Sequence, residues 1–239
     1  PNVSLINDLV AVASGIPLLG PDDLLTINPG TPDPCGTIAV IAPGTGLGEA
    51  YLTHDGSGYS AHPSEGGHAD FAPTDALQSG LLSYLLEKYD HVSYERVCSG
   101  IGIPAIYAYF RDRLGYEEPP WLSNRLAQAR DPAIVIREAA QDDETVCELC
   151  RMTMQTFVRI LGAEAGNLAL KLLPTGGLYL AGGLPPRIAT MLSQGGFMDA
   201  FASKGRLSSV VRRVPVHVVM DTDVALLGAA SRGIDSLPR

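Results

Sequence analysis

The sequence predicts an α/β fold, because strand-like and helix-like segments alternate along most of the chain. Three observations carry this prediction. Residues 37–42 form an apolar run that enters a glycine turn, as a buried strand does. Residues 142–174 contain apolar side chains at helical spacing over several turns. Residues 176–192 and 213–234 each combine a short strand-like run with a following helical pattern.

The composition is that of a globular protein with an acidic balance. The chain has 239 residues, 46% of them hydrophobic and 18% charged, and its formal net charge is −9. This length allows one large domain or two small ones. An acidic surface repels a phosphodiester backbone, so we expect no nucleic-acid partner. A phosphate ligand would have to be met by backbone N–H groups instead.

The sequence predicts neither a membrane span nor secretion. No apolar run reaches the roughly 18 to 20 residues that a spanning helix needs, so we expect no membrane partner. The apolar first residues lack a basic beginning and include Asp8, which does not match a signal peptide. Because the chain begins with Pro1, we expect it to be processed or cut from something longer.

The four cysteines are too few for a disulfide framework in a chain of this length, which favours a reducing, cytoplasmic setting. Cys147 and Cys150 form a C-x-x-C pair, which zinc-binding and redox proteins also use. They lie in a helical pattern, however, and no second Cys/His pair stands at ligand spacing. The favoured interpretation is therefore a structural role for both thiols, with no metal site.

A helix start and a hairpin are predicted in the first quarter of the chain. Asn7 and Asp8 stand at a strand-to-helix junction, after the apolar residues 3–6. Residues 48–64 have the alternating pattern of two strands on either side of a turn at Asp55-Gly56 and Gly58, which is typical of a hairpin.

The middle of the chain is predicted to be helical with one irregular connection. Leucines over residues 74–90 form a helical stripe, with Thr74 as the expected N-cap. A short helix or turn is expected around Glu95, and a longer helix over 104–115. Residues 116–132 are rich in Pro, Glu and Asn and are expected to be an exposed connection.

The periodic segment 142–174 is predicted to be one long helix that ends at Pro174. Gly162 and Gly166 lie inside it, where glycine lowers helix stability. We therefore expect another stretch of backbone to pack closely against this helix.

Two glycine turns are candidates for contact with an anionic ligand. Gly44, Thr45 and Gly46 follow a strand, and Gly182 and Gly183 stand between a strand and a helix. Glycine lets a backbone approach a ligand and present N–H groups to it. The first turn matches neither the Rossmann nor the Walker pattern. Each turn could instead be structural, the first a tight hairpin and the second a strand-to-helix turn, where glycine is common.

Asn7 and Asp8 allow two interpretations. An amide and a carboxylate before a helix could simply cap it. Alternatively, the carboxylate could take a proton from a substrate hydroxyl while the amide orients that substrate.

Glu65, His68 and Glu95 are hydrogen-bonding side chains in glycine-rich or apolar surroundings. Carboxylates and a neutral imidazole are strong, directional partners for the hydroxyls of a sugar. Other roles stay open: Glu95 as a solvated residue, His68 as a core histidine, or a metal site of Glu65, His68 and Asp70. Three ligands so close together on a glycine loop are weak support for a metal.

Five segments, in order along the chain, resemble the bacterial glucokinase family of the actin and hexokinase superfamily. They are "LINDLVAVA", "IAPGTGLGEAYL", "PSEGGHADFAP", "HVSYERVCSG" and "GNLALKLLPTGGLYLAGGLPPRI". The first has Leu9 where that family usually has Phe. The C-x-C-G-x-x-G-C run of the zinc-bearing repressor/kinase relatives is absent, which disfavours that branch and its metal.

The resemblance implies an actin-like ATPase (ribonuclease H-like) fold and a cytoplasmic transferase. This enzyme would phosphorylate the 6-hydroxyl of glucose with ATP, the first step of glycolysis. Asp8 would be the catalytic base for that hydroxyl. The other sugar hydroxyls would be held by Asn7, Glu65, His68 and Glu95. The ATP phosphates would meet Gly44, Thr45 and Gly46, and the adenosine would face Gly182 and Gly183. Mg²⁺ would be held mainly through the ATP phosphates.

The resemblance also implies that part of the family's architecture is missing. Members open with a strand and a D-x-G-G-T phosphate loop before Asn-Asp, whereas this chain begins at Asn-Asp. We therefore expect residues 1–18 to be a remnant of the small domain, 19–217 the large domain with the sugar site, and 218–239 a segment returning to the small domain. Its helix at about 222–233 should pack on the absent part.

Two functions follow from these expectations. The first is a glucokinase or its sugar-binding part. The alternative is a non-catalytic truncated module that binds sugar or only dimerises. By analogy with the family we expect a homodimer, for which the long helix over 142–174 is the candidate interface.

Overall fold

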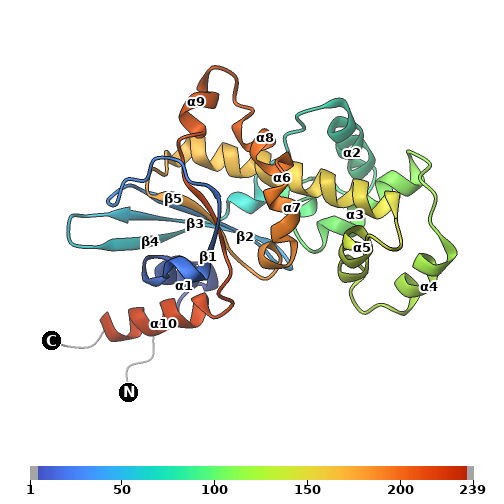
Figure 1. Ribbon diagram of the computed structural model, residues 1–239. Helices are drawn as coiled ribbons and strands as arrows, with labels where there is room; N and C mark the ends of the chain where they lie inside the picture. The colour runs from blue at the N-terminus through green and yellow to red at the C-terminus, as the bar shows by residue number, and fades with distance from the viewer. Residues whose placement is uncertain (1–4, 236–239) are drawn as a thin grey trace.

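The computed structural model describes residues 5–235, and residues 1–4 and 236–239 lie outside the described part (Figure 1). The fold is built on one six-stranded sheet with the strand order β1-β6-β5-β2-β3-β4. Its strands are β1 (Leu24–Asn28), β2 (Ile38–Pro43), β3 (Leu47–His54), β4 (Tyr59–Ser64), β5 (Gly177–Leu180) and β6 (Val216–Val219). Strands β6, β5 and β2 are parallel neighbours, and β1, β3 and β4 run antiparallel to their partners.

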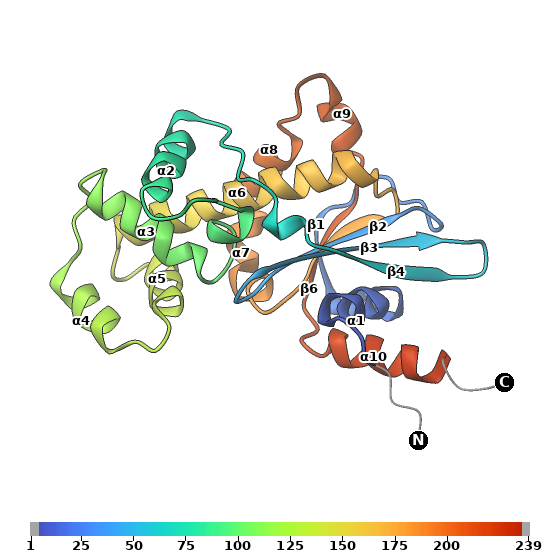
Figure 2. The same cartoon turned by 180° about the vertical axis from the view of Figure 1, so that it is seen from behind.

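The predicted α/β class is confirmed, since helices cover both faces of this sheet. The α-helices are α1 (Asp8–Gly15), α2 (Ala76–Leu86), α3 (Gly102–Asp112), α4 (Pro120–Gln128), α5 (Pro132–Gln141), α6 (Glu148–Leu172), α7 (Ala189–Ser193), α8 (Gly196–Ala202), α9 (Ser208–Val211) and α10 (Val224–Asp235). Short 3₁₀ turns include η3 (Gly66–His68) and η4 (Tyr94–Arg96). Helices α1 and α10 lie together on one face, α6 crosses the other, and α2 to α5 gather at one end (Figures 1 and 2).

Alternation along β2 divides the core between the two faces. Ala39 and Ile41 join the larger core that includes α6, whereas Ile38, Val40 and Ala42 join the smaller core that includes α1. All five side chains are buried, because a central strand covered on both sides has no solvent face. This burial explains why residues 37–42 are apolar without alternation.

Close packing at the glycines of α6 is confirmed. A Cβ on Gly162 would overlap the carbonyl oxygen of Phe197, and one on Gly166 would overlap that of Phe201. Both partners lie on α8. Glycine at these two positions therefore lets α8 pack directly on the backbone of α6.

We expect Gly162→Ala to lower the free energy of unfolding by about 2 kcal/mol, although alanine favours a helix more than glycine does. The added methyl group would meet backbone that cannot rotate away. Urea denaturation measures the effect. Gly196→Ala is the matched control, because a Cβ there meets nothing within 4 Å and should change stability little. An unchanged midpoint for Gly162→Ala would contradict close packing of α8.

Three sequence-based expectations for this region are wrong. The N-cap of α2 is Asp75 rather than Thr74, because the Asp75 carboxylate accepts the backbone N–H of Gln78 at 2.8 Å. Residues 116–132 are not simply a connection, since they contain α4, which begins at Pro120 and buries Leu122. Helix α6 begins only at Glu148, because Cys147 is its N-cap.

Two further expectations have a different outcome. The strand expected over residues 3–6 falls partly outside the described residues, and the described Leu5 and Ile6 are not in a strand. The helix expected over 222–233 is α10, and it packs on α1: a Cβ on Gly228 would overlap the carbonyl oxygen of Ala11.

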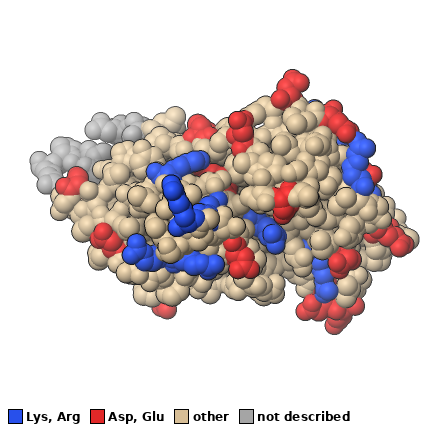
Figure 3. All heavy atoms as spheres, turned by 90° about the horizontal axis from the view of Figure 1, so that it is seen from above, with Lys and Arg blue, Asp and Glu red and all other residues tan. Residues whose placement is uncertain are grey.

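Within residues 5–235, no helix combines the length and the apolarity that crossing a membrane requires. On the face of the molecule seen in Figure 3, acidic and basic side chains are interspersed rather than separated into two regions.

Candidate active site

The turn between β2 and β3 is the point around which the predicted site residues gather. The backbone N–H of Gly44 donates to the carbonyl of Gly46 at 2.8 Å, which closes the turn. The carbonyl of Gly44 accepts the N–H of Gly100 at 2.7 Å. The structural interpretation of this turn is thus correct, since it is the tip of a hairpin. Thr45 at the tip is exposed, so the turn is also open to a ligand.

Glu95 fastens this turn to η4. Its Oε2 accepts the backbone N–H of Leu47 at 3.1 Å, and a Cβ on Gly46 would overlap the same oxygen. The Glu95 carbonyl in turn accepts the Ser99 hydroxyl at 2.6 Å. Glu95 is therefore not a freely solvated residue, because its carboxylate lies against the turn.

The loop that holds Glu65 and His68 lies beside the same turn. The His68 N–H donates to the Glu65 carbonyl at 3.0 Å, which forms the 3₁₀ turn η3. A Cβ on Gly67 would overlap the carbonyl of Leu47, so this glycine is needed for the close approach. The two side chains point outward, with Nε2 of His68 4.0 Å from Oε2 of Glu65 and 61% and 85% of these side chains exposed.

The first turn of α1 completes the group. Asn7 Oδ1 accepts the N–H groups of Leu9 at 2.9 Å and Val10 at 3.2 Å, so the capping interpretation of Asn7 is correct for this oxygen. Asp8 is exposed, and its Oδ1 accepts the Leu9 N–H at 2.8 Å. The Leu9 side chain packs where Gly48 has no Cβ, which places this helix start beside the beginning of β3.

A cavity of about 840 Å³ is lined by Gly44 and Thr45 of this turn. Gly183 lines it too, so both glycine turns reach one cavity. Gly182 has φ +85°, and a Cβ there would lie 3.0 Å from the Pro43 carbonyl. The second turn therefore packs directly on the end of β2.

Helix α5 forms the opposite wall of this cavity. Its first residue, Pro132, and its N-cap, Asp131, both line the space, so the positive end of the helix dipole faces it. Arg130, Arg137 and Arg187 line it as well. The Nε of Arg137 is buried without a hydrogen-bond partner in the described part of the chain. Such a donor fits a ligand that brings acceptor atoms, such as a phosphate or a purine.

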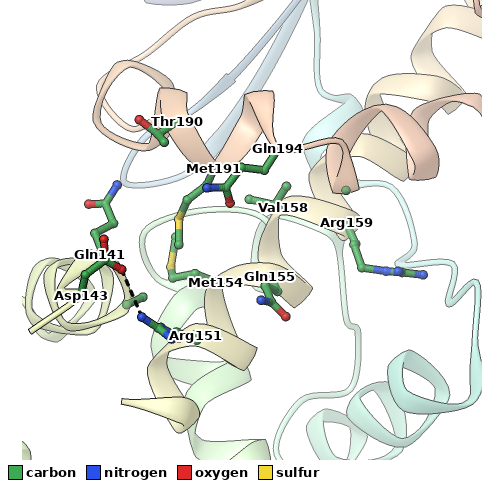
Figure 4. Close-up of a pocket in the computed structure, with 12 residues that line it drawn as sticks. Gln141, Asp143, Arg151, Met154, Gln155, Val158, Arg159, Thr190, Met191 and Gln194 are labelled. Carbon is green, nitrogen blue, oxygen red and sulfur yellow. Dashed lines mark hydrogen bonds and ion pairs between the residues drawn. The ribbon is translucent and has the colours of Figure 1, made fainter. Parts of the chain in front are cut away.

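A second cavity, of about 630 Å³, contains none of the predicted site residues. It lies between α6 and the α7–α8 region, and Figure 4 shows Met154 and Met191 side by side within it. Arg151 on its rim is already paired with Asp143 at 3.2 Å. The charge of Arg151 is therefore already balanced by Asp143.

The cysteine pair has a structural role. The Cys147 sulfur accepts the Cys150 N–H at 3.4 Å and caps α6. Both thiols are buried, and burial raises the pKa of Cys150 far above its usual value. The described residues contain no group of three or more His, Cys, Asp or Glu side chains arranged for a metal.

A sequence profile of the glucokinase family matches residues 1–234. The chain belongs to the glucokinase family. The glucokinase of Nostoc sp. PCC 7120 is 45% identical over 242 residues, which cover 96% of this chain and 70% of that relative. The crystal structure of a glucokinase from an Antarctic psychrotroph is 34% identical, with a TM-score of 0.81, and covers 97% of this chain and 68% of the other.

Kinases with much lower sequence identity to this chain share its fold. A ROK family glucokinase from Streptomyces griseus, solved in complex with glucose and AMPPNP, has a TM-score of 0.60 at 18% identity. It covers 95% of this chain and 66% of the other, and at this identity it shows the fold alone. Our chain therefore has the actin-like ATPase fold, and it is a member of a family of glucose kinases.

Several residues that line the 840 Å³ cavity carried no prediction. They are Gly100, Ile101, Asp131, Ile134, Arg137 and Arg187. Asp131, Ile134 and Arg137 belong to α5 or its N-cap. The Asp131-Pro132 pair before apolar residues at helical spacing is a helix-start signal that could have located this helix, although no helix was predicted there.

Proposed function

We propose that this chain carries the sugar site and the phosphate-transfer centre of an ATP-dependent glucokinase. The observation that carries the proposal is the meeting of three segments at residues 44–48. The first turn of α1, η3 and η4 contact this stretch, and Gly44 and Thr45 also line the 840 Å³ cavity. A sugar hydroxyl and a nucleotide phosphate could thus reach the same turn.

The sugar would be bound by Asn7, Glu65, His68 and Glu95. The side chains of Glu65 and His68, at η3 and its N-cap, are largely exposed, and Glu95 lies against the turn. Charged and neutral acceptors held on rigid backbone can pair several hydroxyls at once. A sugar that lacks or inverts one hydroxyl would leave one of these groups unpaired, which is the proposed basis of specificity.

ATP would occupy the cavity lined by both glycine turns. We propose that Gly44, Thr45 and Gly46 meet its phosphates and that Gly182 and Gly183 face its adenosine. The unpartnered Nε of Arg137 supports a ligand with acceptor atoms. Mg²⁺, when bound with ATP, would neutralise phosphate charge. Because the described residues hold no cluster of three or more metal ligands, we propose that the phosphates hold it.

In the proposed reaction, Asp8 accepts the proton of the 6-hydroxyl as that oxygen attacks the γ-phosphorus of ATP. The bond from this phosphorus to the bridging oxygen breaks, so the products are glucose 6-phosphate and ADP. The protein contributes chiefly position and charge in such transfers. Asp8 lies in the first turn of α1, held by its bond to the Leu9 N–H.

We further propose that the chain divides into three segments: residues 1–18, 19–217 and 218–239. The mutual packing of α1 and α10 supports grouping the two end segments. Homodimer formation, a cytoplasmic setting and a place in glycolysis are proposed from family membership. Sedimentation velocity tests the dimer.

Calorimetric titration with glucose and with ATP, together with an assay for ADP release, tests the function. We expect saturable binding of glucose and release of ADP only when both ligands are present. Binding of glucose without ADP release would support the non-catalytic alternative. Binding of neither ligand would contradict the proposal.

We expect Gly182→Ala to raise the KM for ATP about tenfold, because a side chain at φ +85° is strained and its Cβ would press on Pro43. The glucose Kd should stay within a few-fold. Gly205→Ala is the matched control, since Gly205 also has a positive φ of +55° but meets nothing within 4 Å. Equal effects of the two variants would show that strain alone, and not the cavity, explains the change.

A further inference from the structure

Two buried carboxyl groups lie beneath the proposed sugar site. Glu49 on β3 is 1% exposed, and Glu164 on α6 is fully buried. The Oε1 atoms of both have no hydrogen-bond partner in the described part of the chain. Glu49 lies on the same face of β3 as Leu47, the face that α6 covers. Burial without full hydrogen bonding strongly destabilises the ionised form of a carboxyl group. The presence of a pair of such groups therefore needs an explanation.

Glu49 supports the loop that carries Glu65 and His68. Its Oε2 lies so close to Gly66 that a Cβ on this glycine would overlap the carboxylate. The carboxyl group therefore fills the space where a side chain would otherwise stand. On the other side of Gly66 the loop is exposed at Glu65 and His68.

Glu164 is linked by hydrogen bonds to η4, the segment that carries Glu95. Its Oε2 accepts the amide of Asn167 at 2.9 Å, and the same amide group donates to the Tyr94 hydroxyl at 3.0 Å. Tyr94 directly precedes Glu95 on η4. The two buried acids thus underlie both segments that present groups to the sugar.

The charged and titratable groups around the pair favour a single negative charge. Lys171 Nζ lies 3.6 Å from Glu164 Oε1, so Glu164 has an ionic partner. Lys204 is engaged by the Asn167 side chain at 2.6 Å and the Ala163 carbonyl at 2.9 Å. The thiol of Cys98 is also near both acids.

Burial, and then the charge of Glu164, raise the pKa of Glu49 to about 7, although Lys171 lowers it somewhat. Glu49 is therefore mostly protonated below this pH and ionised above it. The same proton also links pH to stability. Because this pKa exceeds the usual 4.5, the contribution of Glu49 to the unfolding free energy falls as pH rises from about 4.5 through 7.

We propose that Glu49 is a positioning residue for the sugar: its neutral carboxyl holds the Gly66 loop in the binding geometry, and its ionisation beside Glu164 displaces that loop. The ionised group needs water, and the loop beside it is exposed to solvent at Glu65 and His68. The proton leaves to solvent, and no other bond changes. This inference rests on the proposed function, because it assigns the loop to sugar binding.

Glucose binding should therefore weaken as pH rises. We expect the wild-type Kd for glucose to increase at least about fivefold between about pH 6 and pH 8, measured by calorimetry. Glu49→Gln should abolish this dependence and keep the Kd near the value at acid pH, because an amide has the shape of the neutral acid. Glu148→Gln, an exposed position on α6, is the matched control and should behave as wild type. His68 and Glu65 are unchanged in all these proteins, so a difference between the variants comes from the substituted side chain.

Glu164→Gln provides a second, independent variant. Removal of its charge takes away one cause of the raised pKa of Glu49, so the loss of affinity should begin at lower pH. Infrared spectroscopy gives a readout that does not need sugar. The carbonyl stretching band of a protonated buried carboxyl should be present at acid pH, disappear as pH rises, and be absent in Glu49→Gln.

The possible outcomes separate this inference from the proposed function. Absence of the titrating band, or the same pH dependence of Kd in Glu49→Gln as in wild type, would overturn the inference while glucose binding itself stands. A wild-type chain that shows the band but binds no glucose at any pH would overturn the proposed function, and the positioning role with it.

Discussion

Replacement of Asp8 by asparagine is expected to lower kcat by at least about 10³-fold while the Kd for glucose stays within a few-fold. Asparagine has the same shape and can still accept the Leu9 N–H that Asp8 accepts. It cannot take the proton of the attacking hydroxyl, so only the transition state loses an interaction. Steady-state kinetics combined with calorimetry on the same preparation measures both quantities.

Asp199→Asn is the control for this substitution. Asp199 also lies in the first turn of a helix, α8, and is exposed. Any general effect of removing a negative charge near a helix N-terminus should therefore occur in both variants. If Asp8→Asn retains turnover, Asp8 has no part in proton transfer.

Glu95→Ala is expected to weaken glucose binding about 100-fold, through two losses at once. The sugar loses a charged acceptor, and the N–H of Leu47 loses the Glu95 Oε2 to which it donates at 3.1 Å. Hydrogen bonds to charged groups and unsatisfied buried donors each contribute about 1 to 3 kcal/mol. Calorimetric titration with glucose measures the change.

Glu95→Gln separates the loss of the charge from the loss of the hydrogen bond to Leu47. The glutamine oxygen can still accept from Leu47, so the turn should be kept while the charge is removed, and we expect a loss of only about tenfold. Glu117→Ala, at an exposed position, should leave affinity unchanged. If Glu95→Ala binds glucose as tightly as wild type, the role of Glu95 is limited to holding the turn.

The elements that could be predicted are those whose pattern is local. The apolar run that became β2, the hairpin of β3 and β4, and the long helix α6 each show their periodicity within a short window of sequence. Helix α4 was missed because its Pro and Asn content is typical of a connection, yet Pro at the first helical position and the burial of Leu122 favour a helix. Similarly, whether Thr74 or Asp75 caps α2 depends on backbone geometry that both residue types allow.

Single residues of the candidate site could not be assigned from their own surroundings. Asn7 is a helix cap in the structure, as its local sequence suggests, and nothing around it in the chain points to Glu95. The ordered set of motifs named a family, and with it a group of residues. Only the contacts of Leu9 with Gly48 and of Glu95 with Gly46 showed that distant segments meet at one turn.

The sequence by itself determined the fold class, the family and the strand and helix periodicities, because backbone preference and side-chain spacing act between near neighbours. The tertiary structure alone decided that Glu49 and Glu164 are buried together, that α5 lines the same cavity as Gly44 and Thr45, and that α10 packs on α1. The physical reason is that desolvation and charge coupling depend on which surfaces meet in the folded chain. The local sequence around a glutamate in an apolar stripe is the same whether its neighbour in space is water or another acid.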